Sequence, residues 1–165
     1  MANSEQTIHE LMENHAQPGT VTWIGVRPER HAPIDVRSSV EALTAKGLMG
    51  DRYKTTRNGK RQVTIVQAEH LPVMASILDL EAVTPEQLRR NLLVDRINVL
   101  ALKNKRFAIG DVILEGTGLC APCSQMEATF GPGGYNAMRG HGGITARILE
   151  GGEIRLGDPV RLLVE

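Results

Sequence analysis

Aromatic side chains are scarce in this chain of 165 residues, at only 3% of the total. The core must therefore be built mainly from Val, Leu, Ile and Met. The chain also has no excess of either charge, because 19 basic and 19 acidic residues give a formal net charge of zero. Dedicated nucleic-acid binders usually carry a basic excess that displaces counterions. We therefore expect no nucleic-acid partner.

Long apolar runs are absent as well. No stretch approaches the roughly 20 apolar residues that a membrane-spanning helix needs, so we expect no membrane association. The first 19 residues contain acidic side chains and do not resemble a secretory signal peptide. They predict a helical leader over 1–19, with Asn3 as its N-cap, Gln6 at the capping-box position and Pro18-Gly19 at its end. The remainder, 20–165, is predicted to be one domain in the reducing cytoplasm.

Short segments rich in β-branched residues dominate that domain. Strands are predicted over 20–26, 39–45 and 61–67, with further β segments over 107–115, broken at Gly110-Asp111, and over 152–164. Helices are predicted over 68–80 and from Thr84, which has Pro85 at the first helical position. A glycine-bracketed turn is expected at 46–52, a hairpin turn at Asn58-Gly59 and an irregular loop over 131–143.

These elements indicate a mainly β protein of the α+β class. The predicted strands do not alternate with long helices, which argues against a doubly wound parallel sheet. A closed or nearly closed β-barrel with a few short peripheral helices would also protect the strand edges.

Cysteine is nearly absent: the chain has two, in Cys120-Ala121-Pro122-Cys123. A secreted disulfide scaffold would have more, spread further apart. Structural zinc needs four ligands, and only His141 is an obvious third. A dithiol redox centre would usually lie in a βαβ context, which the sequence does not predict. A soft metal ligand and a pair of inert buried thiols are the other readings, and the residues alone leave all of them open.

Two polar features accompany the cysteines. The segment 131–143 holds six glycines around Arg139 and His141, which favours either an anion-binding ligand loop or a mobile surface loop. Arg90 and Asn91 follow a predicted helix. Arg90 could bind a phosphate and Asn91 could hydrogen-bond to the edge of a heterocycle, or both could simply form a solvated helix end. Within the basic stretch 52–61, Arg52 follows Gly50-Asp51 and is the residue expected to point into a site.

An ordered set of motifs resembles the MOSC domain, the module named after the C-terminal part of molybdenum cofactor sulfurases. The resemblance runs from about Thr20 to Leu163 and is closest to a stand-alone, bacterial-type, single-domain member. Its motifs are Gly47-Leu48-Met49-Gly50-Asp51-Arg52, Val63-Thr64-Ile65-Val66-Gln67-Ala68-Glu69-His70-Leu71, Arg90-Asn91-Leu92, Ile109-Gly110-Asp111-Val112, Ala121-Pro122-Cys123, Gly142-Gly143-Ile144 and Gly152-Glu153-Ile154-Arg155-Leu156-Gly157-Asp158-Pro159-Val160.

The resemblance implies a site for molybdenum cofactor, which combines a pterin, a terminal phosphate, a dithiolene and the metal. Cys123 matches the cysteine that coordinates molybdenum or carries sulfur, and Cys120 is auxiliary. Arg90 and Asn91 match the region near the pterin, and Arg52 and Thr64 are weaker matches. Arg139 and His141 join this candidate set from the glycine-rich segment.

Three activities are consistent with these residues. The first is reduction of N-hydroxylated compounds with electrons from an external donor protein, and the second is carriage of cofactor or sulfur to an acceptor protein. The third is CxxC dithiol oxidoreductase chemistry. The pyridoxal-phosphate-dependent domain of full-length sulfurases is not recognisable in the sequence, so no role for pyridoxal phosphate is expected.

Overall fold

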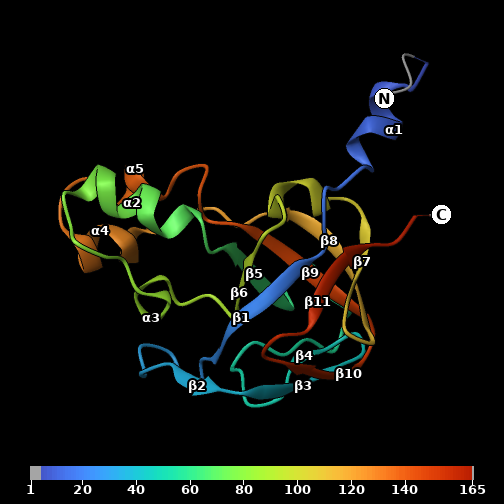
Figure 1. Ribbon diagram of the computed structural model, residues 1–165. Helices are drawn as coiled ribbons and strands as arrows, with labels where there is room; N and C mark the ends of the chain where they lie inside the picture. Colours follow the sequence, from blue (N-terminus) through green and yellow to red (C-terminus); the bar gives the residue numbers. More distant parts are fainter. Residues whose placement is uncertain (1–4, 165) are drawn as a thin grey trace.

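A computed structural model describes residues 5–164, and within this range seven strands close into a barrel (Figure 1). Its strands follow the order β11-β7-β8-β9-β5-β6-β1, and pairing of β1 with β11 completes the ring. Neighbouring strands are antiparallel except β5 and β6, which run parallel. The strand bounds are β1 (Gly19–Val26), β5 (Val63–Gln67), β6 (Leu92–Asp95), β7 (Arg106–Ile109), β8 (Val112–Leu119), β9 (Ile144–Glu150) and β11 (Pro159–Leu162).

The barrel interior is the main hydrophobic core. It contains Phe107, Ile24, Ile65, Leu114 and Ile148, each almost completely buried, together with many other aliphatic residues. Inward-facing aliphatic side chains fill a small barrel because residues alternate between its interior and exterior. The predicted mainly β barrel of the α+β class is therefore confirmed.

Four further strands lie outside the ring. β2 (Asp35–Arg37) pairs with β1 and extends the sheet beyond the barrel. A separate sheet has the order β10-β3-β4, with β3 (Ser39–Leu43), β4 (Gly47–Leu48) and β10 (Gly152–Arg155), and lies below the barrel in Figure 1. Ile154 and Leu48 of this sheet are buried in the main core, so the two sheets share one apolar interior.

Four helices gather at one side of the barrel (Figure 1). α2 (His70–Leu78) and α3 (Pro85–Leu88) connect β5 to β6, while α4 (Ser124–Phe130) and α5 (Gly134–Met138) connect β8 to β9. A 3-10 helix, η1 (Val99–Leu102), follows β6. The helices cover the outer face of the barrel through a second apolar cluster, which includes Val66, Met74, Leu88, Leu93, Met126 and Met138.

Local sequence signals position several of these elements correctly. The capping box of Thr84 and Gln87 starts α3, with Pro85 in its first turn. Gly110 adopts a left-handed φ of 57° where β7 turns into β8, as the predicted break at Gly110-Asp111 requires. The strand predictions over 20–26, 39–45 and 61–67 match β1, β3 and β5 within a few residues.

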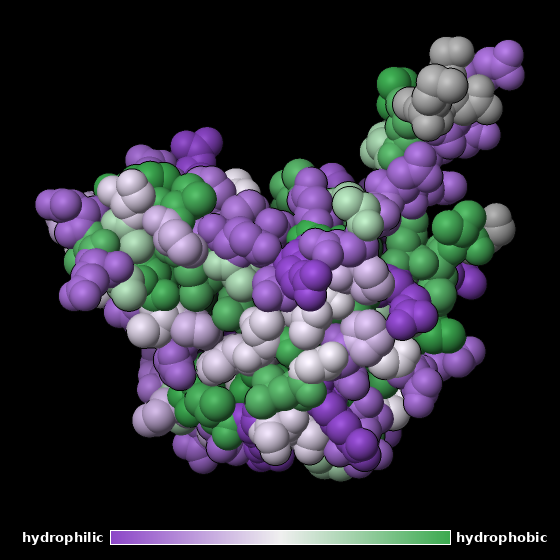
Figure 2. Space-filling view, in the orientation of Figure 1, coloured by the Kyte–Doolittle hydropathy of each residue, from purple (hydrophilic) through white to green (hydrophobic). Residues whose placement is uncertain are grey.

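The N-terminal helix differs from the predicted one. Asn3 lies outside the described residues, and α1 (Ile8–Met12) is capped by Thr7 and Glu10 rather than by a box that includes Gln6. None of its residues is buried. α1 projects from the body of the molecule, with hydrophobic and hydrophilic residues both on its surface (Figure 2).

Two loop predictions are wrong. Segment 131–143 is not irregular throughout, because Gly134–Met138 forms α5 and packs Ala137 and Met138 inward. No hairpin forms at Asn58-Gly59, because the described chain has no strand between β4 and β5. The buried Gln62 holds this loop instead: its amide donates to Gly59 O at 2.8 Å and its Oε1 accepts from Ile148 N at 2.9 Å.

None of the helices within 5–164 has the length and apolar character needed to cross a membrane.

Candidate functional site

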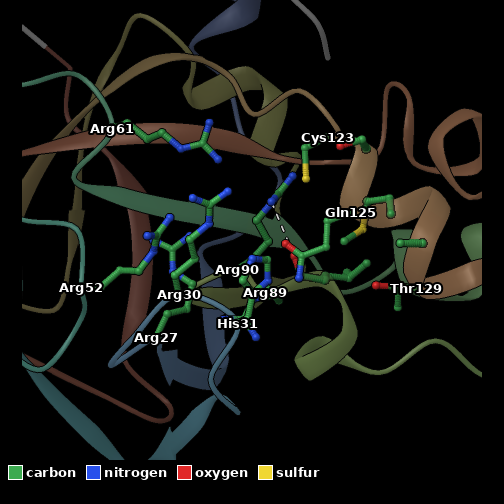
Figure 3. A pocket seen from close by; sticks show the side chains of 14 residues that line it. Arg27, Arg30, His31, Arg52, Arg61, Arg89, Arg90, Cys123, Gln125 and Thr129 are labelled. Carbon is green, nitrogen blue, oxygen red and sulfur yellow. Dashed lines mark hydrogen bonds between the residues drawn. The ribbon is translucent and has the colours of Figure 1, made fainter.

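A cavity of about 630 Å³ opens where the helices meet the barrel (Figure 3). Four separate segments line it: the loop after β1, the loop between β4 and β5, the end of α3, and α4 with its N-cap residue Cys123. Arginine side chains extend into it from one side, and α4 faces them with the Cys123 thiol, Gln125 and Thr129. The lining residues are Arg27, Arg30, His31, Arg52, Arg61, Leu88, Arg89, Arg90, Cys123, Ser124, Gln125, Met126, Ala128 and Thr129.

Six arginines line this one cavity, and no acidic residue is among the described residues that line it. Like charges so close together destabilise the folded protein, and the cost grows where solvent is excluded. Burial and the neighbouring charges of Arg27 and Arg52 lower the pKa of the Arg89 guanidinium. An arrangement that repels itself in this way favours binding of an anion.

Asp51 lies behind the cavity lining and holds the lining residue Arg27 in place. Its buried carboxylate accepts hydrogen bonds from Arg27 N at 2.7 Å, Arg27 Nε at 3.2 Å and Arg27 Nη2 at 3.0 Å. Arg52 follows directly and is held through its backbone, with Arg52 N donating to Arg27 O at 2.6 Å. Asp51 of the Gly50-Asp51-Arg52 motif thus positions Arg27 through an ion pair. Arg52 is positioned because it is the next residue in the chain and its backbone is hydrogen-bonded to Arg27.

Arg90 is the buried member of the arginine set, at 5% exposure. Its Nε donates to Gly142 O at 3.0 Å, and weaker contacts at 3.5 Å join Nη1 to Leu88 O and Nη2 to Ala121 O. Burial lowers the pKa of its guanidinium, and the nearby Cys120 and Cys123 act in the opposite direction. Arg90 therefore ties the end of α3 to the cysteine segment.

The two cysteines have different surroundings. Cys123 is exposed and occupies the N-cap position of α4, on the cavity wall. Cys120 is buried at 3% exposure, and its backbone N donates to Gly143 O at 2.9 Å. Both thiols are free. Cys123 is therefore the cysteine that a ligand in the cavity can reach.

Comparison with protein families gives one match, the MOSC domain, over residues 37–161. The chain belongs to the MOSC domain family. A comparison with curated protein sequences finds no match.

Solved structures give the same architecture at low sequence identity. YuaD from Bacillus subtilis is 16% identical with a TM-score of 0.76, and the alignment covers 87% of this chain and 94% of YuaD. YiiM from Geobacillus stearothermophilus is also 16% identical, with a TM-score of 0.71 and coverage of 89% and 76%. YiiM from Escherichia coli is 16% identical, with a TM-score of 0.65 and coverage of 88% and 70%. At such identities the likeness concerns the fold.

The MOSC fold brings together three of the residues predicted from the sequence: Arg52, Arg90 and Cys123 all line the cavity. Asn91 and Thr64 do not. Asn91 is completely buried, where its Oδ1 accepts from Thr64 N at 3.0 Å and its Nδ2 donates to Gly25 O at 3.2 Å and Asp51 Oδ1 at 3.3 Å. Asn91 and Thr64 thus brace β5 and β6 and support Asp51 beneath the cavity.

Arg139 and His141 also lie outside the cavity lining. The Arg139 side chain is exposed and donates to Asn136 Oδ1 at 3.3 Å. His141 packs edge-on against His70, with ring centroids 5.3 Å apart, and its Nδ1 lies 3.0 Å from Ala137 O. The glycine-rich segment contributes to the site through the Gly142 carbonyl that holds Arg90.

Several lining residues were not predicted from the sequence: Arg27, Arg30, His31, Arg61, Arg89, Gln125 and Thr129. Arg61 ends the basic stretch 52–61 and Arg89 directly precedes Arg90, but the sequence does not show which way their side chains point. Arg27 and Arg30 lie in a loop with no distinguishing motif. Among residues 5–164, no group of three or more His, Cys, Asp or Glu side chains lies close enough together to hold a metal ion.

Proposed function

We propose that this MOSC protein binds molybdenum cofactor in the arginine-lined cavity, with the Cys123 thiolate as the protein ligand to the metal. The observation that carries this proposal is the position of the exposed Cys123 thiol on the wall of a cavity lined by six arginines. A soft thiolate suits molybdenum, and guanidinium groups suit a phosphate. One protein ligand suffices because the dithiolene supplies the other sulfur donors.

The dimensions and charges of the cavity fit the cofactor. A volume of about 630 Å³ lies within the range of small-molecule sites. Arg90 stands beside Cys123 and offers its guanidinium near the metal end, while Arg52 extends from the opposite loop. The Arg52 guanidinium has no hydrogen-bond or carboxylate partner among the described residues, so a phosphate would satisfy its donors. Asn91, Thr64 and Asp51 act behind this surface by fixing its geometry.

The bound cofactor would supply a two-electron centre that removes oxygen from an N–O group, and the protein would supply orientation and electrostatics. Reduction of an N-hydroxyl group consumes two electrons and two protons, breaks the N–O bond, and yields an N–H group and water. The electrons would come from an external donor protein. Gln125 and Thr129 on α4 face the cavity and can orient a polar substrate by hydrogen bonds.

Metal and pterin content provide the first test. The wild type, Cys123→Ala and the buried control Cys120→Ala would be produced in a host that makes the cofactor. Molybdenum would be measured by mass spectrometry and pterin by fluorescence. We expect both in the wild type and in Cys120→Ala, and loss of molybdenum from Cys123→Ala. Equal molybdenum in all three proteins would refute thiolate ligation, and no molybdenum or pterin even after reconstitution would refute cofactor binding.

Turnover separates the enzyme from a carrier. We expect the loaded wild type to reduce an N-hydroxylated compound when given an artificial electron donor, whereas a carrier would hold the cofactor without turnover. Dithiol chemistry requires both cysteines and a reversible disulfide between them. Cys120→Ser is therefore expected to remain active, and its inactivation with the fold intact would favour the dithiol hypothesis instead.

A further inference from the structure

The cavity carries more positive charge than the proposed cofactor neutralises. Of its six arginines, Arg27 is paired with Asp51. A phosphate monoester brings up to about two negative charges near neutral pH, which is fewer than the five lining arginines that have no carboxylate partner among the described residues. Arginines therefore remain available in the cavity for a second anionic group.

The arginines fall into two groups. Arg27, Arg89 and Arg90 each donate to a protein oxygen: the Asp51 carboxylate, Ala32 O at 2.7 Å, and Gly142 O at 3.0 Å, respectively. Within residues 5–164, the guanidinium groups of Arg30, Arg52 and Arg61 have no hydrogen-bond or carboxylate partner. These three are also exposed, whereas the fixed arginines are buried or half-buried. The unpartnered arginines therefore form the outer part of the cavity.

Arg30 lies on a loop whose shape is already set. Arg89 Nη1 donates to Ala32 O at 2.7 Å, which ties this loop to the end of α3. His31, beside Arg30, adopts a left-handed φ of 62° and also lines the cavity. The backbone from which Arg30 extends toward the cavity is therefore held by a contact with another lining residue.

We infer that the substrate of this site carries its own anionic group, a carboxylate or a phosphate, and that Arg30 recognises it at the outer part of the cavity. This inference rests on the proposed function and names the substrate class for it. The cofactor phosphate would neutralise part of the positive charge of the cavity arginines, and the anionic group of the substrate would neutralise the rest. Arg30 is thereby a specificity-determining residue for the same site.

Anion binding to the loaded protein tests this directly. Inorganic phosphate would be titrated by calorimetry into cofactor-loaded wild type, Arg30→Gln and the control Arg155→Gln, with pterin measured on the same samples. Arg155 is exposed on β10, pairs with Glu153 and does not line the cavity. We expect the wild type and Arg155→Gln to bind phosphate equally, more weakly at high salt, and Arg30→Gln to bind about tenfold more weakly or worse.

A matched substrate pair adds the catalytic readout. A phenylhydroxylamine with a para-carboxylate would be compared with its methyl ester, which lacks the charge. We expect the carboxylate to be preferred in kcat/KM by about tenfold or more, through a lower KM, and Arg30→Gln to remove this preference by raising the KM of the carboxylate toward that of the ester.

The outcomes separate the two proposals. Pterin in the wild type without phosphate binding, or phosphate binding unchanged by Arg30→Gln, would overturn this inference and leave the proposed function intact. Equal kcat/KM for the acid and the ester would do the same. Absence of pterin from the wild type would overturn the proposed function and, with it, the inference.

Discussion

Removal of the Asp51 carboxylate should destabilise the protein strongly. The side chain is completely buried and holds the backbone N and the guanidinium of Arg27, while Asn91 Nδ2 lies 3.3 Å from its Oδ1. Asp51→Ala would leave the Arg27 charge without a partner at 11% side-chain exposure. Loss of one partner of a buried ion pair typically costs about 3–5 kcal/mol. Because Arg27 retains some solvent contact, we expect about 3 kcal/mol.

This cost is measurable and has an internal control. For a protein of this length, about 3 kcal/mol corresponds to a decrease in Tm of about 6–12 °C. Urea unfolding followed by circular dichroism and by fluorescence of the single tryptophan, Trp23, would give the free energy of unfolding. Asp35→Ala removes an exposed ion pair with Arg37 and should cost less than about 1 kcal/mol. If Asp51→Ala costs no more than Asp35→Ala, the assignment of Asp51 as the residue that holds Arg27 in place is wrong.

Two further variants test the glycine-rich segment and the histidine pair. Gly143→Ala should destabilise the protein far more than Gly140→Ala. Both glycines have φ near 80°, but a Cβ at 143 would collide with Ile65 O, whereas a Cβ at 140 meets nothing. Equal losses of unfolding free energy in urea would contradict this explanation. Burial and the neighbouring His141 lower the pKa of His70. Below the ordinary value of about 6.5 the unfolded chain then binds more protons than the folded one, so stability should fall as the pH falls through this window. His70→Gln should flatten the difference in unfolding free energy between pH 7.5 and pH 5, and an unchanged pH dependence would show that other groups cause it.

The sequence by itself determined the local elements and the class of fold. Thr84, Pro85 and Gln87 start α3 through contacts within one turn, and Gly110 supplies the left-handed turn between β7 and β8. Such signals depend on neighbours in the chain, so they can be recognised without the tertiary structure. The glycine count over 131–143 led to the wrong prediction of an irregular loop. Residues 134–138 have a weak helix propensity, but the packing of Ala137 and Met138 makes them helical as α5.

The tertiary structure alone decided which residues form the site. Arg30, Arg61, Arg90 and Cys123 come from four separate segments, and only the barrel and the helices packed on it bring them to one cavity. It also decided that Asn91 turns inward to Thr64 and Asp51, although it is adjacent to Arg90 in the chain. The physical reason is that a residue type fixes what a side chain can bind, whereas long-range packing fixes which way it points and what it meets.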